Sequence, residues 1–130
     1  MSPVGSTTAW FDCSAGASGD MLLGALLDAG ADLARVRAAV DSVLPGSVGI
    51  DVEEVRRAGL RATKVHVTPA EDDPPHRRWS DIQDLLGAAE LTAATRTAAG
   101  AVFERLARAE AKVHGVAVGD VHFHEVGALD

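Results

Sequence analysis

Apolar residues recur along this chain at two different spacings, and the spacings predict which segments are helices and which are strands. From Gly19 to Ala29 the apolar residues repeat at helical spacing, and Gly30 follows in the position that commonly ends a helix. A second amphipathic segment follows Asp32, which can cap it, and stops at Pro45-Gly46. The side chains that we expect these two helices to direct inward are Met21, Leu22, Leu23, Leu26, Leu27, Leu33, Val36, Val40 and Val43.

The middle of the chain predicts a β-hairpin. Residues 48–52 and 60–67 alternate in polarity, and Ala58-Gly59 lies between them, so pairing of the two segments is the simplest arrangement. Short strands are also expected at residues 8–11 and at the end of the chain. The outer face of the hairpin would carry a basic cluster that either receives phosphates or is a solvated face balanced by nearby acids, and we favour the second interpretation. The cluster consists of Arg56, Arg57, Arg61 and Lys64.

Two further helices are predicted after a polar loop at residues 68–78. Ser80 to Gln83 has the form of a capping box that begins a short helix, and Trp79 is placed for a hydrophobic staple. A longer helix extends from Thr92 to His114, and Gly115 ends it. The side chains expected to be buried in these helices are Ile82, Leu85, Leu86, Val102, Phe103, Leu106 and Val113.

The resulting order, β-α-α-β-β-α-α-β, predicts an α+β fold: a two-layer sandwich of the split βαβ (ferredoxin-like) type. The four strands would form one sheet with one covered face, because the middle strands alternate in polarity. A mostly parallel α/β layer is the alternative. The 130 residues, 47% of them hydrophobic, suit a single domain over residues 1–130.

Charge and cysteine content exclude several classes of partner. The formal net charge of -7 argues against nucleic acid or an anionic membrane surface. No apolar stretch approaches the roughly 20 residues of a membrane span, and the first apolar run lacks the basic flank of a signal peptide. Cys13 is the only cysteine, which forbids an internal disulfide and fits a reducing compartment. We therefore expect a soluble cytoplasmic domain.

The first candidate site is the turn of small residues between the expected first strand and first helix. Gly16 and Gly19 would let a ligand approach the backbone, and the helix that Ser18 can cap offers N–H groups to a phosphate. Asp12 and Asp20 bracket the turn and could hold a cation. The alternative is a tight turn in which Ser18 caps the helix and Asp20 complements its dipole, and the residue types leave both open. We expect Cys13 to be a small packed residue.

The second candidate site lies at the end of the chain. In an extended strand, His122 and His124 share one face, while Val121 and Phe123 point to the core. Two imidazoles at this spacing with a flanking carboxylate, Asp120, suit a divalent transition metal, and Glu125 follows directly. They could equally bind an anionic substrate or carry protons near neutral pH. The concentration of histidines favours a functional role over a structural pair.

These two segments carry a family resemblance. Residues 12–28 (DCSAGASGDMLLGALLD) strongly resemble the N-terminal signature of LarC-type nickel-insertion proteins, and residues 121–130 (VHFHEVGALD) look like the second signature of that family. Residues 58–65 and 109–115 also match, so the resemblance covers nearly the whole chain. Two positions depart from the family pattern. Ser14 stands where the family commonly has an aromatic residue, and Ala17 where it commonly has a larger aliphatic one, so the side chains of this loop are smaller than usual. The loop near His76 is also poorer in histidine than in the family, which weakens a nickel-gathering role for it.

The resemblance implies CTP-dependent insertion of nickel into pyridinium-3,5-bisthiocarboxylic acid mononucleotide, which completes the nickel-pincer cofactor of lactate racemase. Nickel would be the substrate metal, with CTP and Mg2+ or Mn2+ as cofactors. Asp12, Asp20, His122 and His124 are the candidate metal ligands. We assign catalytic roles to Asp20 and Glu125 and nucleotide binding to the turn. The turn residues concerned are Gly16, Ser18 and Gly19.

Family members are about three times as long as this chain, so we expect an N-terminal fragment or a product whose remainder is encoded separately. The expected partners are the pincer precursor, CTP, that remaining C-terminal portion and further copies in a homo-oligomer. One alternative is a non-catalytic nickel- or nucleotide-binding module that needs the missing portion. Another is a small hydrolase that uses the opening turn as a phosphate or oxyanion cradle, although no catalytic triad pattern supports it.

Overall fold

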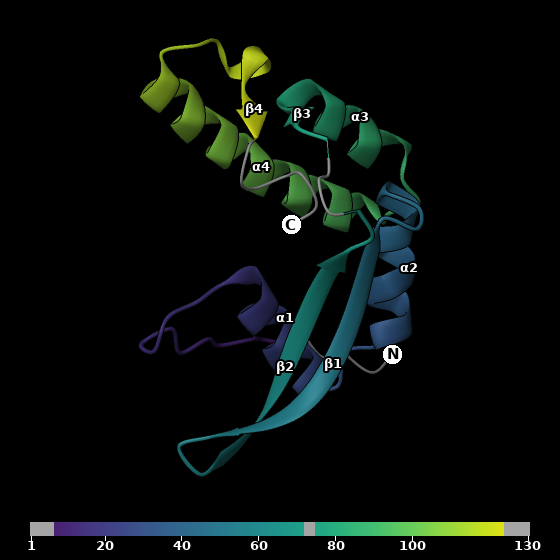
Figure 1. The fold of residues 1–130 in the computed structure, drawn as a ribbon, viewed down its shortest axis with the longest axis vertical. Coiled ribbons are helices and arrows are strands. Elements are labelled where there is room, and N and C mark those ends of the chain that lie inside the picture. Colours follow the sequence, from purple (N-terminus) through teal and green to yellow (C-terminus); the bar gives the residue numbers. More distant parts are fainter. Residues whose placement is uncertain (1–6, 72–74, 124–130) are drawn as a thin grey trace, which may run out of the picture.

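The computed structural model describes residues 7–71 and 75–123, arranged as two helix-and-strand groups (Figure 1). The first group holds α1, α2 and the strands β1 and β2, and the second holds α3, α4, β3 and β4. The elements are α1 (Gly19–Asp28), α2 (Leu33–Val43), β1 (Val48–Arg57), β2 (Leu60–Pro69), β3 (Arg77–Arg78), α3 (Trp79–Ala88), α4 (Ala93–His114), the 3-10 turn η1 (Val118–Asp120) and β4 (His122–Phe123).

The predicted hairpin is present. Strands β1 and β2 pair antiparallel from Val48 opposite Pro69 to Arg57 opposite Leu60. Ala58 and Gly59 both have positive φ, 49° and 79°, the combination that a two-residue hairpin turn requires. Strand β1 continues beyond the predicted end at residue 52 as far as Arg57, because the charged residues near the turn also pair with β2.

The predicted four-stranded sheet is wrong for the part of the chain that is described. Its strands form two separate two-stranded sheets, β1-β2 and β3-β4, so the ferredoxin-like order is not formed there. The fold is mixed α and β with small antiparallel sheets. Strands β3 and β4 contain two residues each and pair with one another, which uses their hydrogen-bonding edges locally.

The strand expected at residues 8–11 is also absent, since this described segment has no strand pairing. Trp10 is 84% exposed and Phe11 44%. Aromatic residues favour strands only where a neighbouring strand and a covered face receive them. No such neighbour reaches this segment within the described residues.

Most of the hydrophobic core lies in the second group, between α3, α4 and β4. Trp79 stacks on Phe103 at 6.3 Å between ring centroids, and Phe103 meets Phe123 edge-on at 6.0 Å. Val43 of α2 packs against this core, linking the two groups. The buried residues of the cluster are Trp79, Ile82, Leu86, Ala107, Ala111, Val121 and Phe123.

The buried face of α4 differs from the prediction. Val102 and Val113 are 67% and 79% exposed, whereas Ala107 and Ala111 are buried. Together with Phe103, these alanines form one row at four-residue spacing, and Val102 and Val113 lie off that row. Alanine has a small side chain, so it lets the neighbouring elements approach the helix closely.

The helix boundaries follow local capping, with one correction. Asp32 accepts a hydrogen bond from the N–H of Ala34 at 2.9 Å, as predicted for the start of α2. The short helix α3 instead begins at Trp79, because Asp81 accepts from the N–H of Arg78 at 2.9 Å. Trp79 is therefore a buried residue of the helix itself, and neither the Ser80 cap nor the staple is formed.

Helix α1 packs on β2 through a glycine. Gly24 is its buried residue, and a Cβ added there would lie 2.6 Å from the carbonyl oxygen of Thr63. The inward stripe predicted for this helix is wrong in part, because Met21, Leu22 and Leu26 are 51%, 37% and 43% exposed. The helix backbone approaches the strand so closely at Gly24 that the leucines flank the contact and stay half-exposed or exposed.

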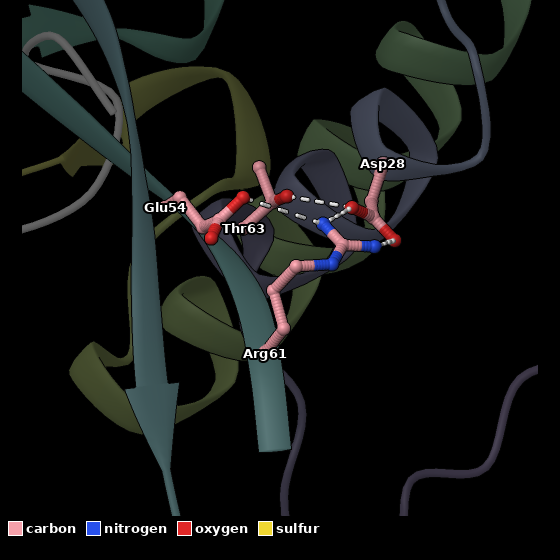
Figure 2. Close-up of polar contacts among 4 residues, drawn as sticks. All are labelled: Asp28, Glu54, Arg61 and Thr63. Carbon is pink, nitrogen blue, oxygen red and sulfur yellow. Dashed lines mark hydrogen bonds and ion pairs between the residues drawn. The ribbon is translucent and has the colours of Figure 1, made fainter. Parts of the chain in front are cut away.

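An ion-pair network fixes the end of α1 to the hairpin. Arg61 Nη1 lies 2.8 Å from Asp28 Oδ1 and 4.0 Å from Glu54 Oε2, and the Thr63 hydroxyl donates to Asp28 at 2.8 Å. Figure 2 shows these four side chains and the contacts between them. Hydrogen bonds that Asp28 accepts from Arg61 and then from Thr63 lower the pKa of Asp28, and the hydrogen bonds that Arg61 donates to Asp28 raise the pKa of Arg61.

This network also corrects the predicted basic cluster. Arg56 and Arg61 lie opposite one another on one face of the hairpin, while Arg57 and Lys64 belong to the other face by strand alternation. The four basic residues therefore do not share an outer face. Arg61 is balanced by acids, as the solvated interpretation requires, although one of these acids comes from α1.

Candidate functional site

The opening turn holds two ionised carboxylates. Asp12 Oδ1 accepts from the N–H of Ser14 at 3.0 Å, and hydrogen bonding from the side chain and backbone of Ser14 lowers the pKa of Asp12. Asp20 Oδ1 accepts from the Ser18 hydroxyl and from the N–H of Met21, and these two bonds, in that order, lower the pKa of Asp20. Both groups carry negative charge at neutral pH.

The backbone of the turn explains its small residues. The N–H of Gly16 donates to the carbonyl of Cys13 at 3.0 Å, and Gly16 has a φ of 103°, which favours glycine. Ser18 caps α1 by accepting from the N–H of Met21, as expected. A Cβ at Gly19 would meet nothing within 4 Å, so the helix entrance is open to solvent. The prediction that Cys13 is packed is wrong, because this free thiol is exposed.

The turn does not by itself supply a full set of metal ligands. Within residues 7–71 and 75–123, no three His, Cys, Asp or Glu side chains lie together in a way that could hold a metal ion. A cation at Asp12 or Asp20 would therefore need oxygen ligands from water, backbone or a bound phosphate. Carboxylate oxygens fit Mg2+ or Mn2+, which bind mainly oxygen and usually retain several waters.

The final strand presents His122 as predicted. Val121 and Phe123 are each 2% exposed, and His122 between them is exposed, so the strand alternates as the sequence indicated. The other two predicted residues of this site, His124 and Glu125, lie outside the described residues. A pocket of about 210 Å³ adjoins the strand; its lining residues are His114, Val116, Asp120, Val121 and His122.

Strand β3 contributes a residue that sequence reasoning missed. Arg78 lies opposite His122 in the β3-β4 pair, and its Nε donates to His122 Nε2 at 3.1 Å. The two residues are 44 positions apart, and each lies in a strand of only two residues. No local periodicity signals such a contact.

The two candidate sites are not brought together. The opening turn lies beside α1 in the first group, whereas β4 lies against α4 in the second (Figure 1). The last strand pairs with β3, so the predicted pairing beside a first strand is not formed among the described residues. A larger hollow of about 420 Å³ lies between α2 and β1, and it contains no predicted site residue.

The described helices include none that is long and apolar enough to cross a membrane. The described residues form a mixed α and β fold with an acidic turn beside α1 in the first group and an exposed histidine between two buried residues in the second. Comparison with known proteins then gives the family: the model of the nickel insertion protein family matches residues 9–130, and the chain belongs to this family.

Two relatives make the similarity concrete. A Nocardioides protein named pyridinium-3,5-bisthiocarboxylic acid mononucleotide nickel insertion protein is 60% identical over 124 residues, which are 95% of this chain and 31% of that protein. A Desulfitobacterium hafniense protein of the same name is 40% identical over 122 residues, 94% of this chain and 30% of that protein. The chain thus spans about a third of the length of these relatives. No solved structure matches it.

Proposed function

We propose that this chain takes part in inserting nickel into pyridinium-3,5-bisthiocarboxylic acid mononucleotide, in a CTP-dependent step of nickel-pincer cofactor biosynthesis. The observation that carries the proposal is the presentation of His122. In a chain of the nickel insertion family, buried Val121 and Phe123 hold an imidazole at the surface beside a pocket. An exposed imidazole on a firmly packed strand is a suitable first ligand for incoming nickel.

The second signature would complete that ligand set. His124 follows at two-residue spacing and would share the face of His122 if the strand continues. Glu125 would act as an acid–base partner or support the imidazoles. Binding by two imidazoles is labile compared with a closed four-ligand site, which suits a protein that must pass the metal to an organic acceptor.

The opening turn is the proposed place for Mg2+ or Mn2+ and the phosphates of CTP. Asp12 and Asp20 are ionised, and Oδ1 of each carboxylate accepts hydrogen bonds from neighbouring residues of the turn. Gly16, Ser18 and Gly19 surround an exposed helix entrance, where a phosphate would meet backbone N–H groups and the positive end of the helix dipole. Asp20 would hold the cation that bridges to those phosphates.

The alternative is a non-catalytic module that binds nickel or nucleotide and depends on the remaining two thirds present in the relatives. The placement of the two candidate sites supports this alternative, because the opening turn lies beside α1 in the first group and His122 lies in β4 of the second, so joint action on one substrate would call for further protein (Figure 1). An assay of nickel insertion distinguishes a catalytic chain from a non-catalytic module. It is run with the chain alone and with the chain plus those remaining two thirds. Activity of the chain alone would contradict the non-catalytic alternative.

We expect this chemistry in the cytoplasm, with the chain in a homo-oligomer.

Nickel titration tests the histidines. We expect His122→Ala with His124→Ala to weaken nickel binding at least about tenfold, because each lost imidazole removes a coordination bond. His66→Ala on the hairpin, whose ring lies 3.0 Å from Glu53, is the control and should leave this binding unchanged. Undiminished affinity in the double variant would show that the metal site lies elsewhere. Binding should weaken in acid, because a metal ion binds the neutral imidazole ring.

Calorimetry with CTP and Mg2+ tests the opening turn. Asp20→Ala removes the carboxylate that we assign to the cation, so the metal-dependent part of CTP binding should fall about tenfold or more. Asp41→Ala, on the exposed side of α2, is a charge-matched control. Equal binding by wild type and Asp20→Ala would remove Asp20 from the site.

A further inference from the structure

The contact between Arg78 and His122 is anchored on both sides. Arg78 and His122 are paired residues of the β3-β4 sheet, and the N–H of Trp79 donates to the carbonyl of Val121 at 3.1 Å. Trp79, Val121 and Phe123 are all buried, so the backbone beneath the two exposed side chains is held by the core. The Arg78 Nε to His122 Nε2 distance of 3.1 Å is that of an ordinary hydrogen bond.

The chemistry of the two groups fixes the state of the ring. A guanidinium has only donors, so His122 Nε2 must accept through its lone pair. The ring that accepts at Nε2 is neutral and carries its proton on Nδ1. Metal ions bind the same lone pair of a neutral imidazole. Arg78 and a metal ion at Nε2 therefore exclude one another.

We propose that Arg78 is a positioning residue that occupies the metal-binding nitrogen of His122 until nickel displaces it. The inference rests on the proposed nickel-binding role of His122. Arg78 keeps the ring in the tautomer whose Nε2 is ready for a metal. It also places a positive charge beside the incoming cation and takes the nitrogen back when nickel departs. The site thereby loads from a preformed ligand and releases its metal readily, as transfer to an acceptor requires.

Removal of the guanidinium should tighten nickel binding. Arg78→Met keeps the aliphatic stem but removes the donor and the charge, so nickel no longer displaces a hydrogen bond or approaches a fixed positive charge. We expect the nickel affinity of the whole chain to rise about tenfold, which is about 1.4 kcal/mol. Arg105→Met on the exposed face of α4 makes the same change in net charge and should alter the affinity less than twofold.

A spectroscopic readout tests the ring state without nickel. At about pH 8, nitrogen-15 shifts of the His122 ring should report the Nδ1–H tautomer in wild type, because Nε2 accepts from Arg78. In Arg78→Met the share of the Nδ1–H tautomer should fall, whereas in Arg105→Met it should be unchanged. A wild-type ring protonated on Nε2 would overturn the inference, because such a nitrogen cannot accept from Arg78.

The outcomes separate this inference from the proposed function. If His122→Ala weakens nickel binding but Arg78→Met leaves it unchanged or weaker, the role of Arg78 is overturned and that of His122 stands. If His122→Ala leaves nickel binding unchanged, the nickel role of His122 fails, and the proposed role of Arg78 in loading fails with it. Tighter binding in Arg78→Met that disappears in the double variant with His122→Ala supports both.

Discussion

The two helix-and-strand groups of this chain differ in how they hold their candidate sites. In the second group, aromatic and aliphatic side chains from α3, α4 and β4 form a closed cluster, and His122 lies directly on it. In the first group, α1 contacts the hairpin at a glycine, and Trp10, Met21 and Leu26 remain exposed. The acidic turn there is shaped by local hydrogen bonds rather than by packing.

The difference indicates how each site could respond to a ligand. A histidine on a packed strand has little freedom of position, so its chemistry is tuned by what touches the ring, here Arg78. A turn held only by its own hydrogen bonds can adjust around a cation or a phosphate. We therefore expect substitutions in the core to disturb the histidine site first, and substitutions in the opening segment to leave the fold nearly unchanged.

The same substitution in the two groups gives the largest expected contrast. Phe123→Ala should lower the free energy of unfolding by about 3–5 kcal/mol, because it empties a nearly fully buried site beside Phe103. Phe11→Ala, at 44% exposure in the opening segment, should change it by only about 0.5 kcal/mol. Urea denaturation of both variants measures the contrast. Equal losses would mean that the opening segment is packed as firmly as the core.

A pair of glycine substitutions addresses the contact of α1 with the hairpin. Gly24→Ala should destabilise the chain by about 1–3 kcal/mol, since the new Cβ would lie 2.6 Å from the backbone oxygen of Thr63. Gly100→Ala in α4 meets nothing within 4 Å and should instead stabilise by up to about 1 kcal/mol through helix propensity. Thermal unfolding of both variants provides the measurement. A stabilised Gly24→Ala protein would contradict the close approach.

The smallest effect is expected from the network at the end of α1. The pKa of Asp28 is lowered in the folded chain, so the ionised carboxylate contributes stability above the unfolded pKa of about 3.9. That contribution is lost as the pH falls through the lower folded pKa. The stability difference between wild type and Asp28→Asn should therefore be steady near neutral pH and shrink in acid.

Denaturation at a series of pH values checks this dependence. Arg61→Met serves as the background for a double-mutant cycle, because it removes the group that contributes most to the lowered pKa of Asp28. In that background, the acid-dependent difference should become much smaller. A difference of the same size with and without Arg61 would assign the effect to another partner of Asp28.

Much of the fold could be read from local sequence because local chemistry determines it. Asp32, Thr92 and Gly115 bound helices where they were expected, since caps depend on residues within one turn. Ala58-Gly59 closes the hairpin because two successive positive φ values suit few other pairs. The alternation of Val121, His122 and Phe123 likewise follows from the geometry of an extended strand.

Tertiary contacts decided the rest. Which row of α4 is buried depended on how closely α3 and β4 approach, and that approach selected Ala107 and Ala111 over Val102 and Val113. Whether residues 8–11 form a strand depended on a partner that local propensity cannot supply. The sequence alone predicted that His122 is exposed and functional. Only the fold brought Arg78 to its Nε2, because the two residues are 44 positions apart and belong to different strands.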